Sequence, residues 1–124
     1  MYRLGTADVW WKVARDNPDF FSDHGQVLKP IGYAFVIDQI KRLCPQKILE
    51  IGHGSSPCIF EIFADSAECW GIDGEDRERT VSKTALDKLR EKMTNVRFVE
   101  GFVGESEGML PDDYFDLAYS VSVI

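Results

Sequence analysis

Apolar residues recur every three or four positions in the first part of the chain, a spacing that predicts two helices. We expect the first helix to begin after Thr6, a favourable N-terminal capping residue, and to end at Pro18. The second should end at Pro45, because proline cannot continue a helix. Residues 20–25, between the two helices, are predicted to form a turn. The apolar positions are Val9, Trp10 and Val13 in the first helix and Tyr33, Ile37, Ile40 and Cys44 in the second.

Beyond residue 45, short apolar runs alternate with amphipathic segments. The runs at 47–51, 69–72, 96–99 and 114–121 predict four strands, and the segments 57–64 and 80–93 predict helices. Strands separated by helices are joined by right-handed crossovers, which make neighbouring strands parallel. The predicted fold class is therefore α/β, a parallel sheet with flanking helices.

The pattern divides the chain into a helical, aromatic segment at 1–45, interpreted as a cap, and a strand–helix domain at 46–124. The fourth predicted strand is apolar on both faces, as a central strand of a parallel sheet would be. The chain nevertheless ends three residues after this strand, so we expect either a domain truncated at that point or a short chain that completes its sheet with a partner. An apolar edge left open would make this chain alone a homo-oligomer or prone to aggregation.

Composition narrows the functional classes. The 124 residues are 44% hydrophobic and 28% charged, as in an ordinary globular domain. A formal net charge of −7 argues against a nucleic-acid partner, which would need a basic surface. No apolar run approaches the roughly 20 residues of a membrane span, and the N-terminus does not resemble a signal peptide, so we expect no membrane contact and a cytoplasmic location. The three cysteines have neither CxxC spacing nor a nearby histidine pair, which argues against a metal site.

The strongest chemical signal is at residues 48–54, where an apolar strand runs into a glycine-containing turn. Gly52 and Gly54 allow the backbone to approach a ligand closely. Asp73 follows the second predicted strand, where a carboxylate can accept hydrogen bonds from both hydroxyls of a ribose. Separately, these features could be an ordinary strand-to-helix turn and a solvated turn residue. Their combination favours a nucleoside-binding site.

Residues 47–121 resemble the N-terminal portion of a class I S-adenosylmethionine-dependent methyltransferase, a family with a Rossmann-like fold. The family pattern is a strand that ends in an acidic residue, followed by x-Gly-x-Gly-x-Gly. Here Glu50 precedes Gly52-His53-Gly54, and Ser56 replaces the third glycine. The acidic residue two positions before the first glycine distinguishes this pattern from the dinucleotide-binding one.

The same resemblance implies further cofactor-binding positions. Asp73 and Gly74 match the motif whose acid holds the ribose hydroxyls. Gly101 matches the turn beside the adenine. Phe102 stands where many members have an aspartate that recognises the adenine amino group, so Phe102 either packs on the base or belongs to the core. Ser120 follows the fourth strand, near the expected place of the methionine part of the cofactor.

The resemblance implies methyl transfer from S-adenosylmethionine to a small-molecule acceptor, with 46–124 as the cofactor-binding half and no identifiable catalytic residue. The sulfonium cofactor is already activated, so the protein mainly has to align donor and acceptor and exclude water. Glu50 could receive the ammonium of the methionine part. His53 is interpreted as a turn residue in preference to a catalytic base, because the sequence shows no partner for it.

Two alternative functions remain. A nicotinamide-dependent oxidoreductase shares the glycine turn and the acid after the second strand. Against it, the third glycine of its pattern falls on Pro57, and Glu50 would have no role. The other alternative is a methyltransferase-like binding module without catalytic activity, which the departures at Ser56 and Phe102 favour.

Overall fold

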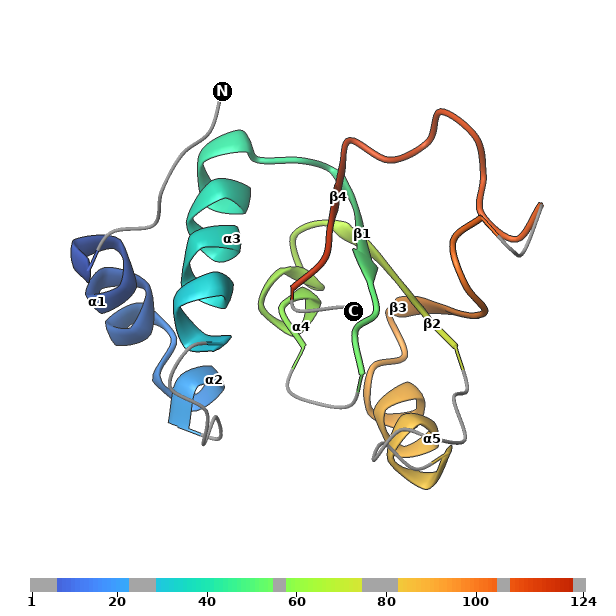
Figure 1. Ribbon diagram of the computed structural model, residues 1–124, viewed down its shortest axis with the longest axis horizontal. Helices are drawn as coiled ribbons and strands as arrows, with labels where there is room; N and C mark the ends of the chain where they lie inside the picture. Colours follow the sequence, from blue (N-terminus) through green and yellow to red (C-terminus); the bar gives the residue numbers. More distant parts are fainter. Residues whose placement is uncertain (1–6, 23–28, 55–57, 75–82, 105–107, 122–124) are drawn as a thin grey trace. The chain divides into compact units, whose positions relative to one another are not determined.

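The structure, a computed structural model, describes residues 7–22, 29–54, 58–74, 83–104 and 108–121 (Figure 1). The chain divides into two compact units, Met1–Cys44 and Pro45–Ile124. Each unit contributes its own set of buried apolar side chains. The prediction that the first unit acts as a cap stays a prediction.

The first unit consists of the helices α1 (Ala7–Asp16), α2 (Pro18–Ser22) and α3 (Lys29–Leu43). The α1 and α3 helices pack against each other. At the end of α3 the Cys44 N–H donates to Ile40 O at 2.9 Å, and Pro45 then prevents continuation. None of the helices in the described segments is long and apolar enough to cross a membrane. The buried apolar residues of this unit are Val13, Phe20, Ala34, Ile37 and Ile40.

The turn predicted from residue 20 onward is wrong for residues 20–22, which belong to α2. Pro18 begins this helix, a position where its fixed φ is favourable and its missing N–H is not needed. The Phe20 ring then packs edge-on against Tyr33 of α3, with ring centroids 5.7 Å apart. Packing against α3 therefore stabilises a helix that the local pattern does not indicate. Thr6 and residues 23–25 lie outside the described residues.

The second unit is built around a four-stranded parallel sheet with the order β3-β2-β1-β4. The strands are β1 (Lys47–Ile51), β2 (Glu68–Asp73), β3 (Val96–Glu100) and β4 (Leu117–Tyr119). Because β1 lies between β2 and β4, the chain leaves the first strand towards one edge of the sheet and later returns to its other side (Figure 1). The predicted α/β fold with a parallel sheet is confirmed.

This unit also contains the helices α4 (Phe60–Phe63), which packs against β2, and α5 (Lys83–Lys92). The Phe60 ring of α4 contacts Phe98 of β3 edge-on, with centroids 5.6 Å apart. Lys92 Nζ of α5 lies 3.9 Å from Glu61 Oε1 of α4. Both helices are shorter than predicted within the described residues, which exclude 55–57 and 75–82. The core under them contains Ile48, Ile59, Phe60, Cys69, Leu86, Leu89 and Val96.

The fourth strand is also shorter than predicted. Tyr114 and Phe115 lie before it and pack edge-on against Trp70 of β2. Asp116 Oδ2 accepts two 3.0 Å hydrogen bonds from the backbone N–H groups at the start of β1, which ties the two strands together. Within the described residues β4 pairs with β1 alone, and Ala118 is exposed. Homo-oligomer formation through this edge stays a prediction.

Candidate functional site

The carboxyl ends of β1, β2 and β3 surround a cavity of about 50 Å³. Ligands of open α/β sheets bind at this end of the strands. The lining residues are Ile51, Gly52, Ile72, Asp73, Gly74, Gly101, Phe102 and Val103. The structure therefore brings together five of the predicted site residues, namely Gly52, Asp73, Gly74, Gly101 and Phe102.

Hydrogen bonds to β2 hold the turn that follows β1. The Gly52 N–H donates to Ile72 O at 2.8 Å, and the Gly54 N–H donates to Asp73 Oδ2 at 2.6 Å. Gly52 and Gly54 have φ values of 69° and 63°, in the left-handed region that favours glycine. Among the described residues a Cβ at Gly54 would meet nothing within 4 Å, so the backbone conformation is what favours glycine there.

Asp73 is both a structural anchor for the turn and the only acidic side chain among the cavity-lining residues. It is 6% exposed. A carboxylate has about four acceptor positions, so the hydrogen bond from Gly54 leaves capacity for donors of a ligand. The predicted position of this acid beside the glycine turn is thereby observed, and its binding of ribose stays a prediction.

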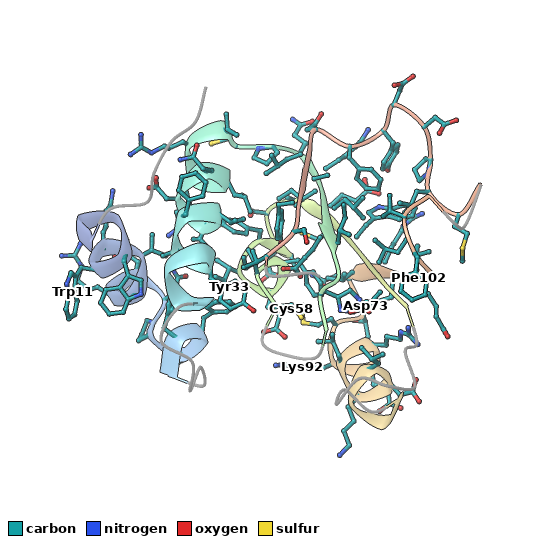
Figure 2. All side chains as sticks on the ribbon, in the orientation of Figure 1. Trp11, Tyr33, Cys58, Asp73, Lys92 and Phe102 are labelled. Carbon is teal, nitrogen blue, oxygen red and sulfur yellow. The ribbon has the colours of Figure 1, made fainter. Side chains whose placement is uncertain are left out.

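Phe102 covers the cavity from the side of β3. Phe102 is 45% exposed, and its ring lies on Gly74, where a Cβ would overlap the ring. The Gly101 N–H donates to Asp73 O at 3.0 Å, which brings the segment after β3 next to the end of β2. Figure 2 shows Phe102 and Asp73 at the same end of the sheet. Phe102 is therefore surface-exposed and not a core residue. Its ring can lie on residue 74 because this residue is glycine and has no side chain.

Glu50 and Tyr119 lie opposite each other on the neighbouring strands β1 and β4. Both are buried, with exposed fractions of 5% and 9%. Glu50 Oε1 accepts a hydrogen bond from the Ile59 N–H at 3.3 Å. Within the described part of the chain, Glu50 Oε2 and the Tyr119 hydroxyl have no hydrogen-bond partner.

Burial sets the charge state of Glu50. Loss of water raises the pKa of its carboxyl to about 8, although the neighbouring Tyr119 hydroxyl and Ile59 N–H act in the opposite direction. The hydroxyl is therefore near enough to influence the carboxyl without meeting the geometry of a hydrogen bond to it. The same burial, together with the charge of Glu50, raises the pKa of Tyr119. Both shifts favour the protonated forms of these groups at neutral pH.

The His53 ring lies away from the cavity, against the face of the sheet that carries α4. It sits between the rings of Phe60 and Phe98, with centroids 5.6 Å and 5.4 Å away. A Cβ on Gly71 would come within 2.7 Å of His53 Cδ2, so the glycine makes room for the ring. Nδ1 is 2.6 Å from Gly54 O and must donate to it, since a carbonyl only accepts.

Burial lowers the pKa of His53, which is consistent with a neutral ring that supports the turn. Its Nε2 is buried and has no partner among the described residues. Only the backbone of His53 belongs to the glycine turn beside the cavity. The interpretation of His53 as a turn residue therefore agrees with its position.

The remaining candidates differ in their surroundings. Ser120 is exposed at the carboxyl end of β4 and does not line the cavity. Cys58 and Cys69 are buried packing residues, and burial raises the pKa of Cys69 to about 11. In the described segments no group of three His, Cys, Asp or Glu side chains is arranged to hold a metal ion.

Sequence reasoning missed four residues of this region. Ile51, Ile72 and Val103 line the cavity, and their positions at or just beyond strand ends were a usable signal. Tyr119 faces Glu50, but this pairing follows only from the register between β1 and β4. No pattern in the sequence sets that register.

A second acid–phenol pair lies at the opposite, amino end of the sheet. Glu68 Oε1 accepts hydrogen bonds from the Tyr114 hydroxyl at 2.5 Å and from Trp70 Nε1 at 3.0 Å. These two donors lower the pKa of Glu68. In this pair the phenol hydroxyl and the acid are hydrogen-bonded to each other, whereas Glu50 Oε2 and the Tyr119 hydroxyl have no partner among the described residues.

Comparison with known proteins gives a structural match. No protein-family model and no curated protein sequence matches the chain. The fold is similar to that of the SAH-bound methyltransferase PaMTH1 of Podospora anserina, with a TM-score of 0.55 and 20% sequence identity. The match covers 95% of this chain and 51% of that chain, so the chain spans about half the length of PaMTH1 as crystallised. At this identity the likeness shows the fold.

Proposed function

We propose that the second unit binds S-adenosylmethionine and that the protein is a methyltransferase acting on a small-molecule acceptor. The observation that carries this proposal is the convergence of Asp73 and the Gly52–Gly54 turn at one cavity, at the carboxyl ends of β1 and β2. The structural likeness to an SAH-bound methyltransferase supports it. The net charge of −7 favours a small acceptor over a nucleic acid.

The residues at the cavity fit the parts of this cofactor. The adenine would lie against the apolar surface of Ile72, Gly74 and Phe102, and the ribose hydroxyls would bind Asp73. The amino-acid part would extend over the glycine turn towards Glu50, where a buried oxygen has no partner among the described residues. A nucleoside needs more space than about 50 Å³, since typical ligand pockets measure roughly 300–1,000 Å³. Binding therefore requires the exposed Phe102 ring to rotate off Gly74.

The chemistry that the cofactor supplies when bound is a methyl group on a positively charged sulfur. The protein residues need only hold and orient the donor, exclude water and present the acceptor in line. Asp73 orients the ribose, and the left-handed glycines let the backbone come close. The proposal assigns no general base in the second unit, since the His53 ring is buried away from the cavity.

Isothermal titration calorimetry with S-adenosylhomocysteine tests the proposal. Asp73→Asn keeps the size of the side chain and an oxygen for the Gly54 N–H, but it removes the charge that would hold the ribose. Because hydrogen bonds to charged groups contribute about 1.5–3 kcal/mol, we expect Asp73→Asn to weaken binding about 10- to 100-fold. Asp112→Asn, at an exposed acid that does not line the cavity, is the matched control and should bind as the unchanged protein does.

The outcomes separate the candidate functions. Binding that Asp73→Asn weakens and Asp112→Asn does not supports the proposed cofactor site. Equal loss in both variants, or no binding by a well-folded protein, contradicts it. Binding of NAD in place of S-adenosylhomocysteine would identify an oxidoreductase. Methyl transfer itself is then measured with S-adenosylmethionine labelled on its methyl group and a panel of small acceptors, and binding without turnover would favour a non-catalytic module.

A further inference from the structure

The outward face of α1 carries an exposed tryptophan beside two cations. Trp11 is 66% exposed, and Figure 2 shows it on the side of α1 away from α3. The Trp10 ring packs edge-on against it, with centroids 4.6 Å apart, so the exposed indole is held in place. Trp and Arg side chains carry much of the binding energy of protein interfaces. This surface, the α1 patch, therefore has the composition of a docking surface. It lines a hollow of about 610 Å³ and consists of Trp11, Lys12, Ala14 and Arg15.

The second unit exposes apolar side chains in the segment that follows β3. Of the five large apolar side chains exposed among the described residues, three lie there, namely Phe102, Val103 and Met109. Phe102 and Val103 are neighbours, with exposed fractions of 45% and 55%, and the acid Glu100 just before them is also exposed. Adjacent exposed apolar side chains with a polar rim mark interaction sites more often than scattered single ones do. We call Glu100, Phe102 and Val103 the β3 patch.

Charge is divided unequally between the two units. Residues 1–44 contain six Lys or Arg and five Asp or Glu, a net charge of +1, whereas residues 45–124 contain eight and sixteen, a net charge of −8. Most of this excess lies in residues 98–124, which include six acidic residues and no Lys or Arg. Arg15 of the α1 patch is 3.6 Å from Asp16, but both are exposed, so water weakens this pair. The cationic α1 patch and the acidic surroundings of the β3 patch are therefore complementary.

We propose that the protein binds a second copy of itself through these two surfaces, with the α1 patch of one copy docked on the β3 patch of the other. The Trp11 indole packs on the exposed side chains of Phe102 and Val103, and Lys12 lies near Glu100. When each copy docks on the other, the two contacts close a two-fold dimer, whereas contacts that do not close continue head to tail. The edge of the sheet takes no part. This interface goes beyond the proposed function and does not rest on it.

The size of these surfaces predicts weak association. An aromatic side chain buries about 150–250 Å², so one contact buries on the order of 500 Å² and two contacts about 1,000 Å². Interfaces below roughly 1,200 Å² belong to transient complexes. We therefore expect a dissociation constant of about 10–100 µM. Because salt screens exposed charges, raising NaCl from about 0.05 M to 0.5 M should weaken the association about fivefold.

Sedimentation velocity of the whole chain from about 2 to 200 µM measures this association, and its sensitivity to single residues tests the α1 patch. Trp11→Ala should weaken it about 30-fold, as loss of a central aromatic anchor does. Because Trp11 is exposed, the variant should keep its fold, which circular dichroism checks. Leu43→Ala is the matched control, since Leu43 is a 62% exposed apolar residue of the same unit that does not line the hollow.

Reversal of charges tests which surfaces meet. Lys12→Glu and Glu100→Lys should each weaken self-association about tenfold, because each places like charges on both surfaces. An equimolar mixture of the two variants pairs opposite charges in both contacts and should associate as the unchanged protein does. The mixture of Lys41→Glu and Glu91→Lys carries the same net charges at exposed positions outside both patches, and these two variants should associate normally alone and when mixed.

Each outcome decides for or against the interface. A chain that stays monomeric at about 200 µM contradicts it. So does an association that Trp11→Ala and Leu43→Ala weaken equally, which would place the contact elsewhere, for example at the open edge of the sheet. A mixture of Lys12→Glu and Glu100→Lys that associates no better than either variant alone also overturns it. No cofactor is present in these experiments, so their failure leaves the proposed cofactor site standing.

Discussion

Replacing Glu50 by glutamine should change how the stability of the empty protein depends on pH. Between pH 4.5 and about 8 the folded protein holds a proton on Glu50 that the unfolded chain does not, because the pKa of the carboxyl is raised from 4.5 to about 8 by burial. Unfolding therefore releases a proton in this range, and the free energy of unfolding falls as pH rises. The contribution is fully present below pH 4.5 and is lost by about pH 8.

The size of this effect follows from the pKa and the burial of the group. One pH unit corresponds to about 1.4 kcal/mol for each proton exchanged, so the loss across the whole range is on the order of 5 kcal/mol. Because Glu50 is only 5% exposed, solvent reduces this contribution to stability little. In the Glu50→Gln variant the side chain at position 50 is an amide, which does not titrate between pH 4.5 and 8. The variant should therefore gain stability relative to the unchanged protein as pH rises.

Urea unfolding of both proteins at half-unit intervals from pH 5 to 8.5 measures the difference. Taking the difference cancels other groups, including His53, whose lowered pKa makes stability fall as pH drops below 6.5. Glu68→Gln is the control: the pKa of Glu68 is lowered, so it is ionised in both states above pH 5 and should add no slope. A stability difference between Glu50→Gln and the unchanged protein that stays constant within about 0.5 kcal/mol across this range would refute the assignment of a buried, protonated Glu50.

Three further predictions concern the frame of the site, each measured as the free energy of unfolding in urea. Gly71→Ala should cost about 1–3 kcal/mol, because the new Cβ would come within 2.7 Å of the His53 ring; a neutral result would mean that the ring moves aside freely. Gly54→Ala should lower the free energy of unfolding by about 1–2 kcal/mol from its φ of 63°, since no described atom lies within 4 Å of the new Cβ. Gly54→Asn should lower it less, because asparagine tolerates such angles better. Asp116→Ala should lower the free energy of unfolding by about 1–2 kcal/mol, because it removes the acceptor of two N–H groups at the start of β1. If it lowers stability no more than the control Asp112→Ala, at an exposed acid, solvent replaces the lost carboxylate as acceptor.

The strands were predictable because local chemistry specifies them. A short, mostly apolar run such as 47–51 is typical of a strand in a parallel sheet, and the structure has β1 at those residues, buried in its middle. The positions of Gly52 and Asp73 beside one cavity also followed, since consecutive parallel strands joined by a right-handed crossover bring their carboxyl ends together. These features depend on short stretches of sequence and on general rules of handedness.

Other elements were not predictable for identifiable reasons. The α2 helix is five residues long, too short for its periodicity to show, and Phe20 gains stability from Tyr33 of α3. The predicted fourth strand extended back to residue 114, yet Tyr114 lies outside β4 because its ring packs on Trp70 and its hydroxyl binds Glu68. In both cases a contact between distant residues decided the local conformation.

The sequence by itself determined the α/β class, the glycine turn and the acids at the ends of the first two strands. Only the tertiary structure decided that Glu50 meets Tyr119, that Phe102 lies on Gly74 and that the His53 ring turns away from the cavity. Glu50 and Tyr119 lie on strands far apart in the chain, and apolar patterning identifies a buried strand without fixing which residue it faces. Pairing and side-chain direction depend on packing across the sheet, so they are settled only when the whole sheet forms.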